Sequence, residues 1–244
     1  MSELCLHADQ LIAEGKLQES LDLCLSAFRG AEKGSEAERA VDPEVLWRTS
    51  RAYYLLAEEE EKQTKTNQAH YEEAFRLANI AMEVGAHIPA VHVWHGAALG
   101  GVVKFMPPKQ QIAEAYNIRD RFAKALEIDA THGHAYQCWG AWCYEVSQIG
   151  WLSRQAATLL FGAPPSATME EAEKYLLEAK KHQEEGPNYM YINGYLGMVY
   201  YKMGKIDESL RHFDDALAMP AKTQAQQRWK EKLTEKREKC AKKK

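Results

Sequence analysis

One seven-residue pattern occurs near both ends of this chain and constrains its fold more than any other feature. Residues 15–21 read Gly-Lys-Leu-Gln-Glu-Ser-Leu, and residues 204–210 read Gly-Lys-Ile-Asp-Glu-Ser-Leu. On both sides of each copy, small and apolar residues recur at spacings of three and four, which place side chains on one helical face. Such a recurrence indicates an array of repeated supersecondary units.

Each copy of the pattern predicts a pair of helices. A small residue, Ala8 or Gly197, lies seven residues before the glycine, and that glycine can end the first helix in a left-handed cap. The Gln-Glu or Asp-Glu pair then places negative charge at the positive end of the second helix dipole. A pair of this kind cannot bury its apolar face alone, so it must stack on a neighbouring pair.

Five such pairs account for most of the chain. The small positions of successive pairs are separated by 43, 47, 42 and 57 residues, more than the 34 of a regular tetratricopeptide unit, so each pair carries an insertion. The residues predicted at this position are Ala8, Arg51, Ala98, Gly140 and Gly197. The predicted units are residues 1–34, 43–86, 89–131, 132–186 and 187–222. Arg51 is too large for the position, and we expect the packing of its unit to adjust.

Two further helices are predicted outside the pairs. Residues 151–161 have apolar side chains at helical spacing, and we expect this short helix to lie on the array. Residues 223–239 place apolar side chains on one side and fit the polar-faced helix that caps a terminal repeat. The predicted fold is therefore an all-α, right-handed solenoid over residues 1–222, with a basic capping helix and tail over residues 223–244.

Composition and the first residues predict a cytoplasmic location. The start, Met-Ser-Glu-Leu-Cys, lacks the basic-then-apolar layout of a signal peptide, and no apolar run is long enough to span a bilayer. We therefore expect no transmembrane segment. The five cysteines include no Cys-x-x-Cys spacing, which favours reduced, mostly buried thiols.

Charge is distributed unevenly along the chain. From Arg228 onward there are nine basic and three acidic residues, a balance of +6, and the other 227 residues carry 22 basic and 32 acidic side chains, a balance of −10. One interpretation is an arm that contacts the surface of an acidic polymer, and the other is a solvated end of the last helix. The residues predicted for this contact are Arg228, Lys230, Lys232, Lys236, Arg237 and Lys239.

The first helix of each pair is expected to line the inner face of the array. Of the 25 inward positions, 15 are apolar, or 60%, against 45% for the whole chain. One interpretation is a groove that binds an apolar peptide or a lipid chain, with the basic and histidine side chains as polar anchors. The other is that the helix at 151–161 or the tail fills the groove. The predicted groove residues are Arg48, Leu55, His92, His95, Leu99, Tyr144, Tyr191, Met198, Tyr201 and Lys202.

No pattern indicates catalysis. Nucleophile elbows, Walker loops and dinucleotide-binding loops are absent from the sequence. His92 and His95 share a helical face, but zinc would need further ligands at converging positions, so we expect surface or groove histidines. We expect no enzyme, no cofactor and no metal. The acidic remainder of the chain also argues against nucleic acid as the partner of the basic tail.

Three segments resemble the regulator of microtubule dynamics family. They are residues 112–127 (Ile-Ala-Glu-Ala-Tyr-Asn-Ile-Arg-Asp-Arg-Phe-Ala-Lys-Ala-Leu-Glu), residues 142–156 with Trp-Cys-Tyr and Trp-Leu-Ser-Arg-Gln-Ala, and residues 160–168 (Leu-Phe-Gly-Ala-Pro-Pro-Ser-Ala-Thr). The resemblance extends over about residues 7–220. The proline-containing segment is specific, because generic tetratricopeptide proteins do not carry it.

The resemblance implies a tetratricopeptide-like protein that associates with microtubules and the mitotic spindle. We therefore predict a non-enzymatic, cytoplasmic microtubule-associated protein that acts in microtubule dynamics and chromosome segregation, at the spindle and spindle pole. It is expected to bind partners through the groove of the helical repeats. One family member at the mitochondrial surface is linked to membrane contact and phospholipid binding, so the alternative is a phospholipid-binding or lipid-transfer module. A third possibility is a general peptide-binding adaptor. Which peptide, lipid or tubulin surface is bound stays open.

Overall fold

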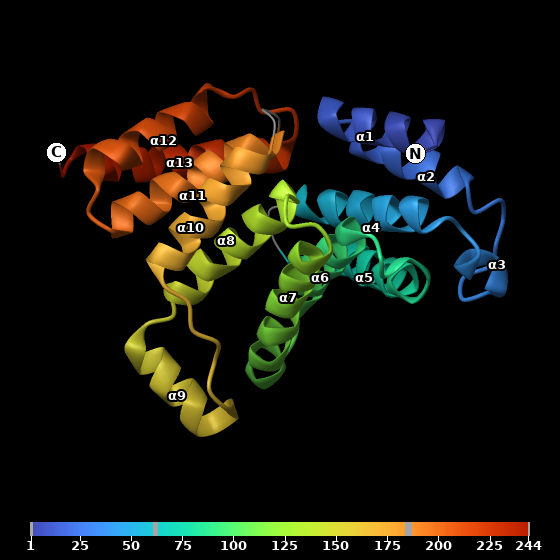
Figure 1. Ribbon diagram of the computed structural model, residues 1–244, viewed down its shortest axis with the longest axis horizontal. Helices are drawn as coiled ribbons and strands as arrows, with labels where there is room; N and C mark the ends of the chain where they lie inside the picture. The colour runs from blue at the N-terminus through green and yellow to red at the C-terminus, as the bar shows by residue number, and fades with distance from the viewer. Residues whose placement is uncertain (1, 61–62, 184–186, 244) are drawn as a thin grey trace. The chain divides into compact units, whose positions relative to one another are not determined.

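The computed structural model describes residues 2–60, 63–183 and 187–243, and every regular element in these ranges is helical. The chain divides into two compact units, residues 1–128 and 129–244 (Figure 1). Within each unit, helices near each other in the sequence pair and the pairs stack, so the predicted all-α repeat fold is confirmed.

Unit 1 stacks three helix pairs. Helix α1 pairs with α2, α4 with α5 and α6 with α7, while α2 packs on α4 and α5 on α6. The bounds are α1 (Glu3–Glu14), α2 (Leu17–Ser26), α3 (Glu36–Arg39), α4 (Pro43–Glu58), α5 (Lys65–Gly85), α6 (Pro89–Val103) and α7 (Pro108–Ile128). The short α3 lies outside the pairs and contacts α5.

Unit 2 stacks two pairs and closes with a single helix. Helix α8 pairs with α10 and α11 with α12, α10 packs on α11, and α13 packs on both α11 and α12. The bounds are α8 (Gly133–Ser147), α9 (Trp151–Phe161), α10 (Met169–His182), α11 (Pro187–Lys202), α12 (Ile206–Ala218) and α13 (Gln224–Ala241). Its core includes Leu176, Leu196, Phe213 and Leu233, all fully buried.

The two matching sequence segments form matching turns. Gly15 and Gly204 have φ angles of 82° and 76°, and each ends its helix in the left-handed region as predicted. Beyond the turn, the hydroxyl of Ser20 donates to the Ala8 carbonyl at 3.0 Å, and that of Ser209 donates to the Gly197 carbonyl at 2.7 Å. The sequence repeat is therefore also a repeat of hydrogen bonds.

Small residues let the paired helices approach closely in unit 2. A Cβ atom on Gly197 would lie 2.6 Å from the Phe213 ring, and one on Gly140 would lie 2.6 Å from Leu176 Cγ. Both separations are too short for a side chain larger than glycine. These two small positions are placed where the sequence predicted them.

In two pairs of unit 1, the residue predicted to be the small one between the paired helices is wrong. Arg51 does not lie between its helices. Ser50 fills that place and donates to the Ala74 carbonyl at 2.7 Å, while Arg51 pairs with Asp9 at 2.6 Å. In the next pair, the ring of Phe122 packs against Gly96, and Ala98 instead belongs to a cluster with alanines of α5. A helix that packs against neighbours on two sides needs small residues on both of its faces. The spacing of small residues alone does not show which neighbouring helix each one contacts.

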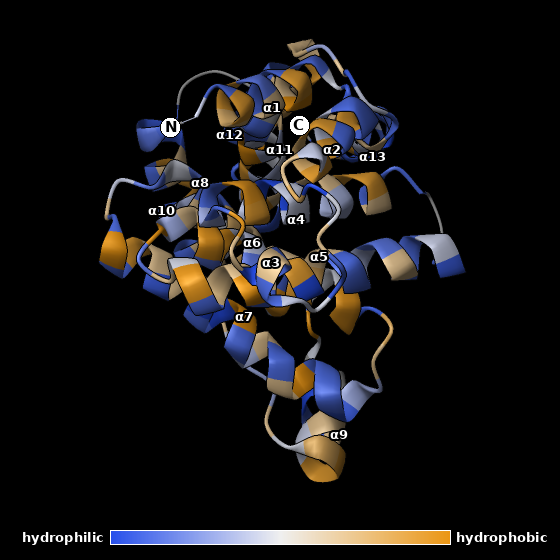
Figure 2. Ribbon diagram, turned by 90° about the vertical axis from the view of Figure 1, so that its right-hand side faces the viewer, coloured by the Kyte–Doolittle hydropathy of each residue, from blue (hydrophilic) through white to orange (hydrophobic). Residues whose placement is uncertain are grey.

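Helix α9 forms at the predicted residues but does not lie on the array. Its exposed apolar residues include Leu159 and Leu160, 84% and 69% exposed. Figure 1 shows α9 set apart from α8 and α10, and Figure 2 colours much of it as apolar. The guanidinium of Arg154 tethers the helix, because it donates to the Pro164 and Pro165 carbonyls at 3.2 and 2.8 Å. The predicted packing of α9 is therefore wrong, although the helix itself is confirmed.

Candidate functional site: a lysine face on α11 and α13

Helix α13 carries all six residues of the predicted basic contact, and two hydrogen bonds cap its first turn. The Thr223 hydroxyl accepts from the Gln226 backbone N–H at 3.3 Å, and the Gln226 side chain accepts from the Lys222 N–H at 2.7 Å. Leu233 and Cys240, seven residues apart, are both buried on the face turned toward the unit. The opposite face is left for charged side chains.

Helix α13 covers the side of α11 that was predicted to line a groove. A Cβ atom on Gly194 would lie 2.8 Å from Trp229 Nε1 and 2.9 Å from Leu233 Cδ1, so α13 packs directly on the α11 backbone there. The Trp229 ring also lies 5.5 Å from Tyr191 and 5.1 Å from Tyr195. The chain's own tail therefore fills the inner side of α11, as the self-filling interpretation expects.

Four lysines gather beside this contact, and we call them the lysine face: Lys202 of α11, and Lys232, Lys236 and Lys239 of α13. Burial lowers the pKa of Lys236, and the charges of Lys232, Lys202 and Lys239 lower it further. Glu145 of α8 opposes this shift. The sequence had assigned Lys202 to the groove and the other three to the tail, and the fold joins them in one basic surface.

Two of the other basic residues predicted in α13 bond to the rest of unit 2. The guanidinium of Arg237 pairs with Asp214 of α12 at 2.5 Å. The Lys230 ammonium donates to the Met219 carbonyl at 2.8 Å, before the start of α13. Arg228 is half-buried. Lys230 and Arg237 therefore tie α13 to the rest of unit 2, whereas Lys202, Lys232 and Lys239 of the lysine face are exposed.

In unit 1, four of the predicted groove residues lie inside the packing. Arg48 is 1% exposed and pairs with Asp9 at 2.8 Å, and Leu99 is also buried. His92 and His95 are buried as well, which corrects the expectation of surface or groove histidines. Their Nε2 atoms lie 2.8 Å from the Ala86 carbonyl and 3.0 Å from Asn79 Oδ1, so one nitrogen of each buried ring has a hydrogen-bond partner. Leu55 is half-buried.

The buried histidines are not cationic anchors at neutral pH. Burial lowers the pKa of His95 to about 4, and the charges of Arg121 and His92 act in the same direction. Burial lowers the pKa of His92 as well. Within residues 2–60, 63–183 and 187–243, no three metal-binding side chains converge on one site.

The predicted groove residues of unit 2 differ in their accessibility. Tyr144 and Met198 are buried, whereas Tyr191 and Tyr201 are half-buried. The ammonium of Lys243 lies 4.3 Å from the centre of the Tyr201 ring, a cation–π contact that extends the basic surface past α13. Of the predicted groove residues in this unit, Lys202 is exposed and belongs to the lysine face.

Comparison with known proteins identifies the family. The sequence profile of the family described as regulator of microtubule dynamics protein 1-3 matches residues 4–241. This chain belongs to the regulator of microtubule dynamics family. It is 29% identical over 204 residues to regulator of microtubule dynamics protein 1 of Mus musculus, covering 83% of this chain and 63% of that protein. With regulator of microtubule dynamics protein 3 of Rattus norvegicus the identity is 28% over 180 residues, covering 72% of this chain and 37% of that protein.

This family member therefore spans only about three fifths of the length of the protein 1 relatives it matches, 63% in mouse and 60% in Bos taurus. Among solved structures, a thermophilic tetratricopeptide-repeat protein of Thermus thermophilus matches with a TM-score of 0.61 and 15% identity, covering 98% of this chain and 97% of that one. At that identity the match supports the fold alone. None of the described helices combines the length and apolar character needed to cross a bilayer.

Proposed function

We propose that this chain is a non-enzymatic microtubule-associated protein that contacts an acidic surface of tubulin through the lysine face. The family supports a role connected with microtubules, because its curated relatives are named as regulators of microtubule dynamics. The lysine face supports an electrostatic contact with an acidic surface, because it places four cationic side chains together on a chain whose net charge is −4.

The gathering of Lys202, Lys232 and Lys239 around Lys236 is the observation that carries the proposal. Burial lowers the pKa of Lys236, and the three neighbouring ammonium groups lower it further, so a carboxylate-rich partner would offset an unfavourable charge arrangement. Attraction of this kind acts over about one Debye length, about 8 Å at physiological salt, and weakens as salt is added. Binding should therefore be fast and sensitive to salt.

Co-sedimentation with taxol-stabilised microtubules tests the proposal. The variant Lys232→Gln/Lys236→Gln/Lys239→Gln should pellet with an apparent Kd at least about tenfold weaker than the unaltered chain, because each lost charge removes part of the long-range attraction. Raising the salt concentration from 50 to 300 mM should weaken microtubule binding by the unaltered chain more than binding by this variant. Equal pelleting of both proteins at low salt would rule out the lysine face as the contact.

The matched control removes the same number of charges elsewhere. Lys109, Lys124 and Lys181 are exposed and lie outside the lysine face, so their replacement by glutamine should leave binding within about twofold. Substitution is preferable to removing residues 228–244, because truncation would also strip the buried Leu233 and Cys240 from unit 2. A truncated chain could then lose binding merely by unfolding.

We extend the proposal to microtubules of the cytoplasm, the mitotic spindle and the spindle pole. In dividing cells, the fluorescently tagged chain should overlap with tubulin, and the triple glutamine variant should be diffuse. The relatives' names do not favour the phospholipid alternative, and α13 covers the α11 part of the inner face on which an acyl chain was expected. Protein partners that bind elsewhere on the array are compatible with this proposal.

A further inference from the structure

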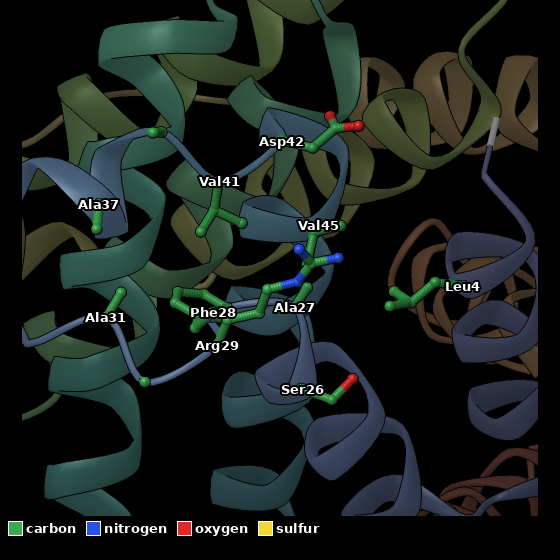
Figure 3. A pocket seen from close by; sticks show the side chains of 12 residues that line it. Leu4, Ser26, Ala27, Phe28, Arg29, Ala31, Ala37, Val41, Asp42 and Val45 are labelled. Carbon is green, nitrogen blue, oxygen red and sulfur yellow. The ribbon is translucent and has the colours of Figure 1, made fainter.

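A cleft opens in unit 1 at the insertion between the first two helix pairs. Its volume is about 730 Å³, within the range of small-molecule and peptide pockets (Figure 3). The end of α2, the short α3 and the start of α4 form its walls, and Leu4 of α1 closes one side. This region belongs to unit 1 and the lysine face to unit 2, and the inference below does not depend on the proposed microtubule contact.

The floor of the cleft is apolar and belongs to the core of unit 1. Phe28 and Val41 pack against the buried cluster that contains Trp47, and both also contact the cluster that contains Val45. Ala37 and Ala40 of the α3 region are exposed and line the opposite wall. A large apolar side chain placed here would be removed from water on more than one side.

The wall formed by α3 is firmly attached to the rest of the unit. The carboxylate of Glu38 is buried and accepts two hydrogen bonds from the Arg76 guanidinium of α5, at 2.9 and 2.7 Å. It also accepts from the Gly34 N–H at 2.7 Å, and Lys33 pairs with Glu73 of α5 at 2.5 Å. Paired charges of this bidentate kind hold a fixed geometry. The cleft is therefore part of the built structure of unit 1.

Arg29 supplies the positive charge of the cleft. Its φ angle of 47° makes it the one residue other than glycine with a left-handed backbone among those that the structure describes. Figure 3 shows its side chain extended toward Val45, with the carboxylate of Asp42 turned away from it. Asp42 is used to cap α4, since it accepts from the Glu44 N–H at 2.8 Å. Within the described part of the chain, the Arg29 guanidinium forms no ion pair.

We propose that this cleft binds a short segment of a partner protein that presents a carboxylate beside one or two large apolar side chains. The carboxylate pairs with the Arg29 guanidinium, and the apolar side chains lie on Phe28, Val41 and Val45. A neutral apolar segment would leave the guanidinium unpaired at the edge of the contact, so the acidic residue is the specific part of the motif.

Selection from a phage-displayed library of random seven-residue peptides on the immobilised full chain tests this proposal. The selected peptides should be enriched in Asp or Glu next to Leu, Ile, Phe or Trp. A synthetic peptide from the selection should bind about tenfold more weakly when its acidic residue is changed to the corresponding amide. Failure to enrich any peptide, or enrichment of peptides without an acidic preference, would overturn the proposal.

Two substitutions then locate the contact. Arg29→Asn should weaken the peptide about tenfold and keep the fold, because Asn tolerates a left-handed backbone and Arg29 is exposed. Ala37→Trp places a large side chain on the exposed wall of the cleft and narrows it, so this variant should also bind the peptide more weakly. Arg39→Asn is the matched control, since Arg39 is exposed in α3 but does not line the cleft. Equal effects of Arg29→Asn and Arg39→Asn would contradict a site at Arg29.

Discussion

At the scale of single residues, glycines in helix α6 decide how closely neighbouring helices pack. A Cβ atom on Gly101 would lie 2.1 Å from the Tyr71 ring, whereas one on Gly100 would meet only Ile118 Cδ1, at 3.8 Å. Tyr71 is 1% exposed, and its hydroxyl bonds with Glu58 and accepts from the Lys104 ammonium at 2.8 Å. The ring therefore has no room to move.

Two adjacent substitutions should act in opposite directions. We expect Gly101→Ala to lower the free energy of unfolding by about 1–3 kcal/mol, because the methyl group overpacks the Tyr71 contact. Gly100→Ala should raise it by about 0.5–1 kcal/mol, because alanine loses less backbone entropy in a helix. Urea denaturation followed by circular dichroism measures both. Destabilisation of equal size by both variants would show that the Tyr71 contact is not the cause.

The buried histidine His95 should make stability depend on pH. Its pKa falls from 6.5 to about 4 on folding, so the unfolded chain binds the proton more readily. The stabilising effect of the neutral ring is complete above pH 6.5 and is lost as the pH falls toward 4. Between pH 7.5 and 5, this one group should cost on the order of 1–2 kcal/mol.

The variant His95→Gln isolates that contribution, since its amide can still donate to Asn79 Oδ1. Its free energy of unfolding, measured by urea denaturation at several pH values, should fall less steeply between pH 7.5 and 5 than that of the unaltered chain. His7→Gln serves as the control, because His7 is exposed. An unchanged slope for His95→Gln would mean that His95 does not resist protonation.

At the scale of helices, α9 and α13 show that helical spacing does not determine burial. Leu233 of α13 is fully buried against α11, whereas Leu159 of α9 is 84% exposed. We expect Leu233→Ala to lower the free energy of unfolding by about 2–5 kcal/mol, and Leu159→Ala to change it by less than about 0.5 kcal/mol. Thermal unfolding of the two variants measures the contrast. A large loss for Leu159→Ala would place α9 within the packed core.

The sequence predicted the helices and turns of this fold better than the contacts between them. Gly15 and Gly204 marked their turns correctly, because a left-handed cap depends on the local backbone. Arg51 was misplaced because contacts with two neighbouring helices compete for one helix surface. Lys202 lies far from Lys236 in the sequence, so no local pattern could place both on one face. No sequence motif indicated the cleft beside Arg29, because the cleft forms where the insertion with α3 packs against α5.

At the scale of the whole molecule, each unit has its own hydrophobic core. The cluster with Leu176, Phe213 and Leu233 draws only on residues of unit 2, and the described clusters of unit 1 draw only on residues before α7. Separate cores indicate that each unit can fold without the other. The two proposed binding sites are also divided between them, because the cleft lies in unit 1 and the lysine face in unit 2.

Residues 1–128 and 129–244, expressed as separate fragments, should therefore each give a helical circular dichroism spectrum and a cooperative thermal transition. The fragment with residues 129–244 should pellet with microtubules in a salt-sensitive manner, because it contains all four residues of the lysine face. The fragment with residues 1–128 should stay in the supernatant. A non-cooperative transition in either fragment would contradict independent cores, whereas pelleting of folded residues 1–128 alone would move the microtubule contact away from α13.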